Sequence, residues 1–258
     1  MIITLTTDFG LRDSFVGTMK GVILSIAPAA QIVDLTHGIT AGDIRGGAFA
    51  LMTAAPFFPD ATIHVTVVDP GVGSARKAIA IRTGRAIFLG PDNGVLSWAV
   101  KEGDAFEIRS VDNSEVFLPH MSNTFHGRDL FAPAAAWLAA KREFCELGPE
   151  LAGFQRADWP NPIRVHEGWK TEVIHVDTYG NAVTAFPAVQ ADGVQAVVLP
   201  GGKRIPFERF YAAVARGSSL AVIGSSGFVE IAINQGDAAR ELGLRTGSEV
   251  IIVFRRLH

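Results

Sequence analysis

The stretch TIHVTVVDPGVGSAR, residues 62–76, decides the fold. Its first half is a β-branched run typical of a buried strand, and its second half is a glycine-containing turn that begins at Asp69 and ends at Arg76. Similar strands, IITLTT and QIVDLTH, come earlier in the chain, and a segment with apolar residues at helical spacing follows each of them. Strands that alternate with helices predict βαβ units, and therefore an α/β fold with a mostly parallel sheet covered by helices on both faces.

The rest of the chain divides into two parts of different character. The first part contains the predicted helices DSFVGTMKGVILSIAP, AGDIRGGAFALMTAAPFF and LFAPAAAWLAAK, and an antiparallel hairpin formed by KAIAIRT and AIFLG. Prolines and tryptophans interrupt the pattern at FQRADWPNPIRVHEGW, and short strands separated by Gly, Pro and Asn follow. We therefore expect an N-terminal α/β domain over residues 1–158, a linker over 159–167 and a smaller C-terminal β-barrel domain over 168–258.

Composition narrows the classes of protein to which the chain can belong. A formal charge of −3 over 258 residues argues against nucleic acid as a partner, because phosphate neutralisation needs clustered Lys and Arg. The single cysteine, Cys145, excludes an internal disulfide and a multi-cysteine metal site, and we expect its thiol to be buried and inert. We expect the first residues, MIITLTTDFG, to form a strand rather than a secretory leader, and no apolar stretch reaches the ~18 residues of a membrane span. We expect a soluble, cytoplasmic protein that does not contact the membrane.

The turn after residue 68 has the glycines of a phosphate-binding loop but not its other features. A Walker-type loop needs G-x-x-x-x-G-K-[ST] before a helix, whereas this turn has no such Lys-Ser/Thr pair and runs into a predicted strand. A dinucleotide-binding fingerprint needs a third glycine, and Asp69 at the entrance would repel a phosphate. What the turn does offer is the carboxylate of Asp69 and the guanidinium of Arg76. Taken alone, this segment favours a structural salt bridge between them.

Other polar residues fall where open α/β sheets bind ligands. Asp8, Asp34 and Asp69 stand near the predicted carboxyl ends of parallel strands. For Asp8 the spacing fits a contact to ribose hydroxyl groups as well as it fits an N-cap of the next helix. His126 precedes a predicted helix, and its imidazole suits proton transfer near neutral pH, although a histidine in this place is more often structural. Asn93 is expected in a tight turn, with a ligand contact as a secondary role.

Several ordered motifs run through both parts of the chain: TTDFG..D.FVG.MKGVI, VVDPGVG..R, GPDNG, TFHGRD.FAPAAA, D.YGN.VT and IGSSGFVEIAINQG.AA. In these motifs the chain resembles the S-adenosyl-L-methionine (SAM) hydrolases that form adenosine, also called SAM hydroxide adenosyltransferases. They are relatives of the SAM-dependent fluorinase and chlorinase. The resemblance implies an N-terminal α/β domain, a C-terminal β-barrel, and a homotrimer with each site between one subunit's N-terminal domain and a neighbour's C-terminal domain. It also implies hydrolysis of SAM to adenosine and L-methionine by attack of water or hydroxide on C5′, with no cofactor and no metal.

The resemblance also implies roles for individual residues. The water-handling residues would be Asp69, Arg76 and His126, and whether Asp69 or His126 is the base stays open. Ribose binding would fall to Asp8. The residues implied for the methionine end and for adenine are Asp177, Asn181, Tyr211, Ser225 and Ser226, with Phe210 as an alternative to Tyr211. Thr178 and Tyr179 stand where the family commonly has Arg and Phe, which affects ligand contacts more than the reaction.

Two other functions remain open at this point. A SAM-dependent halogenase would have the same fold, but the halogenases have tyrosines in place of Asp69 and His126, which favours water as the nucleophile here. A non-catalytic SAM- or adenosine-binding protein would use the same pocket without turnover.

Overall fold

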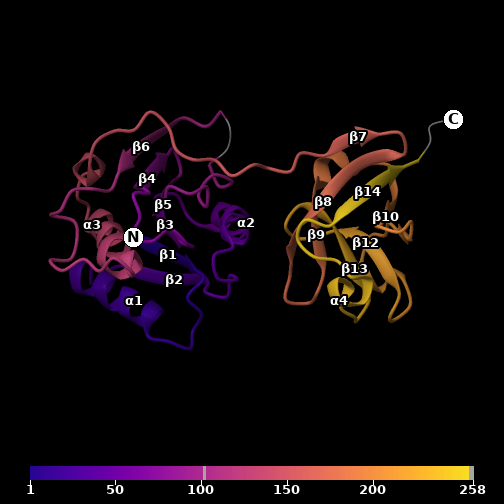
Figure 1. Cartoon of the computed structure of the whole chain (residues 1–258), viewed down its shortest axis with the longest axis horizontal. Coiled ribbons are helices and arrows are strands. Elements are labelled where there is room, and N and C mark those ends of the chain that lie inside the picture. The colour runs from indigo at the N-terminus through magenta and orange to yellow at the C-terminus, as the bar shows by residue number, and fades with distance from the viewer. Residues whose placement is uncertain (101–102, 256–258) are drawn as a thin grey trace. The chain divides into compact units, whose positions relative to one another are not determined.

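The computed structural model describes residues 1–100 and 103–255. The chain forms two compact units, the first spanning Met1–Ala157 and the second beginning at Asp158. Each unit has its own sheet (Figure 1). Two clusters of buried apolar side chains lie in the first unit and one lies in the second. A short strand, β7 (Ile163–Val165), lies among the residues predicted as a linker.

The first unit is built on a six-stranded sheet. Its strands are β1 (Ile2–Thr7), β2 (Gln31–Thr36), β3 (Thr62–Val67), β4 (Ala78–Thr83), β5 (Ala86–Pro91) and β6 (Phe106–Ser110). In the order β2-β1-β3-β5-β4-β6, the pairings from β2 to β5 are parallel, and those of β4 with β5 and β6 are antiparallel. The predicted mostly parallel sheet and the predicted hairpin are therefore confirmed.

Helices cover both faces of this sheet. They are α1 (Phe15–Ile26), α2 (Ile44–Ala54) and α3 (Ala132–Ala139), and Figure 1 shows α1 and α3 on one side of the sheet and α2 on the other. The carboxylate of Asp43 begins α2 by accepting a hydrogen bond from Gly46 N at 2.9 Å, a contact typical of an N-cap. Strand β3 is buried along its whole length. Each Ile, Leu or Met side chain buried in such a core stabilises the fold by about 1.5–3 kcal/mol.

The second unit is an antiparallel, nearly closed barrel. Its strands besides β7 are β8 (Gly168–Val176), β9 (Ala182–Pro187), β10 (Val194–Val198), β11 (Arg204–Pro206), β12 (Ser219–Ile223), β13 (Phe228–Ile233) and β14 (Glu249–Phe254), and its one α-helix among the described residues is α4 (Ala238–Leu242). They follow the order β11-β10-β14-β8-β9-β13-β12, with β7 beside β8. The two ends of this order approach each other, because Glu208 N just beyond β11 donates to Ala221 O in β12 at 2.8 Å. This arrangement confirms the predicted β-barrel.

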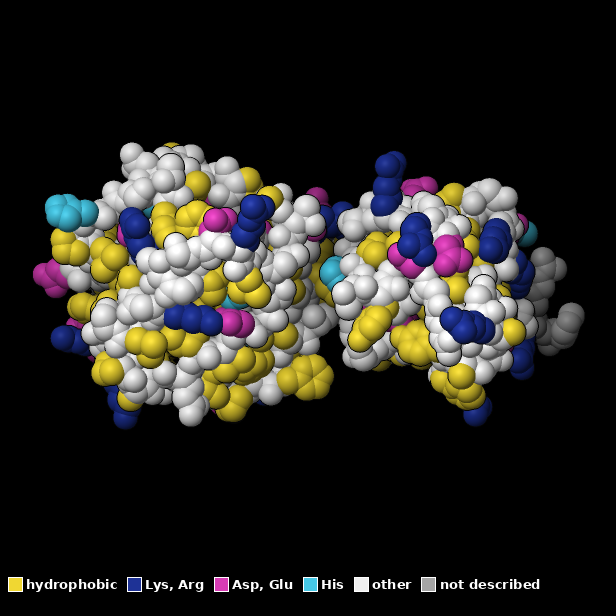
Figure 2. Space-filling model, turned by 90° about the horizontal axis from the view of Figure 1, so that it is seen from below, with side chains coloured by type: hydrophobic (Ala, Val, Ile, Leu, Met, Phe, Trp, Pro, Cys, Tyr) yellow, Lys and Arg dark blue, Asp and Glu magenta, His cyan; other side chains and the backbone are white. Residues whose placement is uncertain are grey.

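The surface overturns one expectation from the sequence. Cys145, expected to be buried, is exposed, because it lies on the outer side of a short 3-10 turn whose Phe144 and Leu147 enter the core. Among the described residues, none of the helices has both the length and the apolar character needed to cross a membrane. Figure 2 shows basic and acidic side chains scattered over the visible face of each unit rather than gathered into one basic patch.

Candidate active site

The turn after β3, residues 69–76, packs closely against the segment that precedes His126, so that the backbones of the two segments are in contact. Val72 N donates to Asp69 O at 3.2 Å, which starts the turn. Gly73 has a φ of +78°, a left-handed conformation that favours glycine, and a Cβ at this position would lie 2.3 Å from the carbonyl oxygen of Asn123. The glycine therefore permits a close approach between two segments that are far apart in the sequence.

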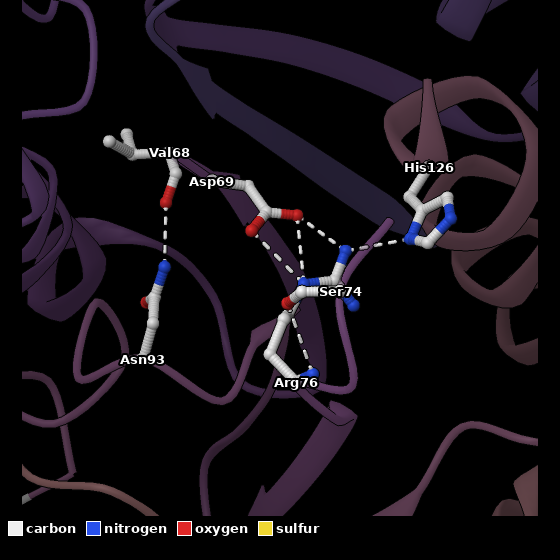
Figure 3. Close-up of polar contacts among 6 residues, drawn as sticks. All are labelled: Val68, Asp69, Ser74, Arg76, Asn93 and His126. Carbon is white, nitrogen blue, oxygen red and sulfur yellow. Dashed lines mark hydrogen bonds and ion pairs between the residues drawn. The ribbon is translucent and has the colours of Figure 1, made fainter. Parts of the chain in front are cut away.

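Asn93 fixes the start of the same turn. Its Nδ2 atom donates to the carbonyl oxygen of Val68 at 2.9 Å (Figure 3). Its Oδ1 atom accepts from Val95 N at 3.1 Å. Both ends of the side-chain amide thus hold the protein's own backbone, which is the structural role predicted for this residue.

Arg76 is held between an acid and an imidazole. Its Nε atom lies 3.0 Å from each oxygen of Asp69, and its Nη2 atom donates both to Asp69 Oδ2 and to Nδ1 of His126, the latter at 2.7 Å. Figure 3 shows the Asp69 carboxylate and the His126 ring on opposite sides of the guanidinium group. The side chains of Arg76 and Asp69 are only 10% and 4% exposed. A charge-assisted, multiply bonded pair of this kind fixes the guanidinium group in one orientation.

The contact with Arg76 determines the protonation of His126. Since an arginine side chain only donates hydrogen bonds, Nδ1 of His126 accepts one and carries no proton, so the neutral ring carries its proton on Nε2. Burial lowers the pKa of His126 and the charge of Arg76 lowers it further, while Asp69 and Asp129 oppose this shift without reversing it. The ring is therefore a neutral hydrogen-bond donor through Nε2.

One turn of π-helix, Gly127–Phe131, follows His126 and anchors it. Asp129 in this turn is fully buried, and its carboxylate accepts from Ser122 N at 2.8 Å and from Arg128 Nη2 at 2.9 Å. The adjacent side chains of Arg128 and Asp129 therefore pair with each other. π-Helical turns are rare and frequently occur at functional sites, which is consistent with the position of this one directly after His126.

Asp8 lies at the same edge of the sheet as Asp69, because the two residues follow the carboxyl ends of the adjacent parallel strands β1 and β3. It follows β1 directly, and its Oδ2 atom accepts from Gly42 N at 2.8 Å. It does not cap α1, whose N-cap position is Ser14. Asp8, Asp69 and His126 line one cavity of about 320 Å³.

An aromatic trio forms part of the wall of this cavity. The rings of Phe9, Phe15 and Phe125 pack edge to face with centroid distances of 5.1 to 5.9 Å. Sequence reasoning missed this trio, although Phe9 and Phe125 stand next to Asp8 and His126 in the motifs. A cavity with an apolar wall and a few fixed polar groups is typical of a small-molecule site.

The remaining predicted residues lie in the second unit, where Asp177 organises a turn between β8 and β9. Its Oδ1 atom accepts from Tyr179 N at 2.9 Å and from Asn181 N at 2.8 Å, and its Oδ2 atom accepts from Asn181 Nδ2 at 3.0 Å. Asp177 and Asn181, which were singled out separately in the sequence, are therefore directly bonded to each other.

Tyr211 reaches a carboxylate that sequence reasoning missed. Its hydroxyl group donates to Oε1 of Glu230, a residue of β13 that is only 5% exposed. Burial raises the pKa of Glu230; the hydrogen bond from Tyr211 acts the other way, and the charge of Asp177 raises the pKa further. The signal in the sequence was a lone Glu within the apolar strand FVEIAIN.

Ser225 and Ser226 lie in the turn between β12 and β13. Ser225 is exposed, whereas Ser226 Oγ is buried and has no hydrogen-bond partner in the described part of the chain. Phe210, the alternative to Tyr211, is 59% exposed. No group of three or more His, Cys, Asp and Glu side chains within residues 1–100 and 103–255 is arranged to hold a metal ion.

Comparison with protein families gives two matches that together span most of the chain. The model described as "SAM hydroxide adenosyltransferase N-terminal domain" matches residues 3–148, and the model for the C-terminal domain of the same group matches residues 171–251.

Similar proteins match nearly the full length of the chain. The (R)-S-adenosyl-L-methionine hydrolase of Thermus thermophilus is 39% identical over 251 residues, which cover 95% of this chain and 96% of that protein. The fluorinase of Nocardia brasiliensis is 27% identical over 290 residues, which cover 96% of this chain and 95% of the fluorinase. A solved structure of an uncharacterised conserved protein from Thermotoga maritima has a TM-score of 0.89 at 38% identity and covers 98% of this chain and 100% of that one.

Proposed function

The chain belongs to the SAM hydroxide adenosyltransferase family, and from that premise we propose that Asp69, Arg76 and His126 carry its chemistry. The chain hydrolyses SAM to adenosine and L-methionine, the activity named for its full-length relatives at 38–39% identity. The observation that carries the residue assignment is the guanidinium group of Arg76, which is fixed between the Asp69 carboxylate and Nδ1 of His126. Asp69 and His126 both line the cavity.

In this reaction the site has to activate the nucleophile, and the leaving group needs no activation. In the proposed step the oxygen of a water molecule forms a bond to C5′ of SAM while the C5′–S bond breaks, and sulfur keeps the electron pair. Methionine leaves as a neutral thioether, so no acid has to protonate it. Bulk water has a pKa of about 15.7, so the site must hold the water in line with C5′ and accept its proton.

The hydrogen-bonding roles divide the work among the three residues. Nε2 of His126 carries a proton and donates to the water oxygen, and Arg76 holds the His126 ring and the Asp69 carboxylate in fixed positions. Asp69 has lone pairs available for a further hydrogen bond, because within the described part of the chain its Oδ1 atom accepts only from Arg76 Nε. Asp69 accepts the proton as the new C–O bond makes the attacking water acidic. A positioned base of this kind contributes about 10²–10⁴-fold to the rate.

The other candidate residues bind the substrate. Asp8 accepts hydrogen bonds from the ribose hydroxyl groups, and the aromatic wall of the cavity excludes bulk water from the sulfonium carbon. In the second unit, Asp177, Asn181, Tyr211, Ser225 and Ser226 bind the methionine end and the adenine. The carboxylates of Asp177 and Glu230 suit a substrate that carries positive charge on both its sulfonium and its ammonium groups.

We propose further that the protein acts as a homotrimer in the cytoplasm, with the residues of the two units completing each site between subunits. The family resemblance supports this assembly. Subunit mixing tests it: an Asp69→Asn chain and an Asp177→Ala chain, each nearly inactive alone, regain activity when they are co-expressed and assemble together. Light scattering gives the mass of the assembly, and failure of the mixture to regain activity contradicts sites shared between subunits.

Turnover in water enriched in oxygen-18 tests the function directly. The purified chain is incubated with SAM in halide-free buffer, and the products are separated by chromatography and weighed by mass spectrometry. We expect adenosine and methionine, with the heavy oxygen in the 5′-hydroxyl group of adenosine, because solvent attacks C5′.

Other results identify other functions. Intact SAM after long incubation indicates a binding protein without turnover. A halogenated nucleoside that forms only when chloride or fluoride is added indicates a halogenase. Adenosine without the heavy isotope contradicts attack of solvent on C5′.

A further inference from the structure

Asp34 has a different environment from the other two aspartates near the strand ends. It lies within β2, and its carboxylate contacts Nζ of Lys20 at 2.6 Å and Nε2 of His37 at 3.0 Å. The side chain of His37 is 2% exposed, whereas those of Lys20 and Asp34 are each about one-third exposed. Asp34 therefore connects a surface cation to a buried imidazole.

His37 in turn holds the turn that carries Asp8. Its Nδ1 atom lies 2.9 Å from Oγ1 of Thr7, the residue before Asp8. Its carbonyl oxygen accepts from Gly10 N at 2.8 Å, two residues after Asp8. Five residues further along the same segment, Gly42 N donates to the carboxylate of Asp8 at 2.8 Å. The segment from His37 to Gly42 thus contacts the Asp8 turn on both sides and at its side chain.

The hydroxyl group of Thr7 connects two neighbours. Its Oγ1 atom accepts from Phe9 N at 3.2 Å and still has a proton and a second lone pair with which to pair with Nδ1 of His37. Nε2 of His37 faces Asp34 in a close polar contact rather than a well-directed hydrogen bond. Partial burial alone would raise the pKa of Asp34, but the contacts with Lys20 and His37 outweigh it and hold the pKa below its usual range. Asp34 therefore stays an acceptor.

We propose that Asp34 and His37 are positioning residues that hold the Asp8 turn in the geometry required to bind the ribose of the substrate. The proposal rests on the proposed role of Asp8 in ribose binding. With Oδ2 of Asp8 fixed by Gly42 and the turn fixed by His37, the carboxylate meets the ribose hydroxyl groups without losing conformational freedom. His37 does not line the cavity and acts only through its neighbours.

Steady-state kinetics with SAM and with its 2′-deoxy analogue test the proposal. A hydrogen bond to a charged group makes a contribution that corresponds to about 10- to 100-fold in binding, so the wild-type chain prefers SAM to the analogue by roughly that factor in kcat/KM. His37→Leu raises KM for SAM and removes most of this preference, while kcat changes little. Asp34→Asn shifts the preference in the same direction by a smaller factor. Because Asp34 is partly exposed, this variant is expected to fold, and it tests the proposal even if His37→Leu does not fold.

His64→Leu is the matched control. Nδ1 of His64 lies 2.8 Å from Oγ1 of Thr4, so this buried Thr–His pair repeats the Thr7–His37 pair on the same sheet, away from Asp8. We expect it to leave the preference unchanged. An equal loss of activity toward SAM and its deoxy analogue in the His37 and Asp34 variants overturns the proposal, because a general structural defect would act on both substrates alike. If the wild-type chain forms no adenosine at all, the proposed function fails instead.

Discussion

Two buried histidines of the first unit, His126 and His64, look alike in several respects. They are 8% and 1% exposed, and burial is the leading cause that lowers the pKa of each. Both line cavities, and the cavity at His64, of about 420 Å³, is larger than the one of about 320 Å³ at His126. Burial, pKa and cavity size alone would therefore rank His64 above His126 as a candidate for chemistry.

Their neighbours separate them. The ring of His64 stacks on Phe88 at a centroid distance of 5.3 Å and meets Phe58 edge to face at 5.6 Å, and burial is the one cause of its lowered pKa, which is about 4. The ring of His126 accepts from Arg76, and the charges of Asp69 and Asp129 also act on it. A perturbed pKa thus indicates a reactive site when charged groups at fixed distances accompany it, and indicates only packing when they do not.

The largest expected effect is the loss of turnover at the His126 site. His126→Ala and Asp69→Ala each lower kcat for adenosine formation by about 10²–10⁴-fold, because the water loses its donor or its proton acceptor. The double variant loses little more than either single variant, since the residues act as a unit. His64→Leu retains turnover. Rate measurements with chromatographic detection of adenosine check these values.

The opposite result for these two variants would place the active site at His64 instead of His126. If His64→Leu abolished turnover in a chain that still folds, and His126→Ala did not, the larger cavity would be the site. Circular dichroism of each variant at neutral pH separates a loss of chemistry from a loss of structure.

The second prediction concerns stability, and here His64 has the larger effect. The folded chain holds the ring uncharged down to a pKa of about 4, while the unfolded chain takes up a proton near 6.5, so stability is lost as the pH falls through this window. A shift of this size corresponds to about 3 kcal/mol in the free energy of unfolding. Urea unfolding of the first unit between pH 7 and 4 measures the change.

The matching variant isolates the contribution of this residue. In His64→Leu the loss of stability between pH 7 and 4 becomes smaller by most of that amount. An unchanged pH dependence would mean that His64 is solvated in the folded chain.

The fold could be predicted from the sequence because its patterns are local. Strand–helix alternation in the first part and short strands with turn residues in the second gave both architectures, since hydrophobic period and turn chemistry act over a few residues. Cys145 was wrongly expected to be buried, because four residues of 3-10 turn are too few to show in the sequence which side faces the core.

The site could be predicted only as a set of separate residues. The motifs singled out Asp69, Arg76 and His126, but the 2.7 Å contact that decides the tautomer of His126 depends on the packing of segments 50 residues apart. Glu230 was missed because a single buried carboxylate in a strand looks like a break in the apolar pattern until its partner, Tyr211, is known. Long-range pairing of this kind has no local signature in one sequence.

The third prediction is the acid limb of the pH–rate profile. Activity requires Nδ1 of His126 to accept a hydrogen bond from Arg76. In a protonated ring Nδ1 carries a proton, which would face the cation of Arg76, and this hydrogen bond would be lost. Because the pKa of His126 lies below 6.5, kcat/KM is constant above that value and falls about tenfold per pH unit well below the pKa.

A variant that keeps the acceptor without titrating tests the origin of this limb. His126→Asn is slower than the wild-type chain, but its residual rate lacks the limb due to His126. A midpoint of the acid limb above pH 6.5 in the wild-type chain would contradict the lowered pKa of His126. It would mean that the charge of Asp69, which raises this pKa, outweighs burial and the charge of Arg76.

The smallest effect tests how the site is held, which also differs between the two histidines. His64 is fixed by aromatic packing, whereas His126 depends on a contact between backbones at Gly73 and Asn123. Gly73→Ala adds a Cβ at 2.3 Å from the Asn123 carbonyl oxygen in a left-handed conformation that costs roughly 1–2 kcal/mol for other residues. The two segments separate, the Arg76–His126 contact lengthens, and kcat falls by up to about tenfold.

Gly71 in the same turn provides the control for Gly73. A Cβ there meets its nearest neighbour, Ser74 Oγ, at 3.4 Å, which is ordinary contact. Gly71→Ala therefore retains nearly full activity, although it adds the same methyl group to the same turn. Equal activity of the two variants would show that the turn adjusts without moving Arg76, and that the ion pair with Asp69 is enough to hold the guanidinium group by itself.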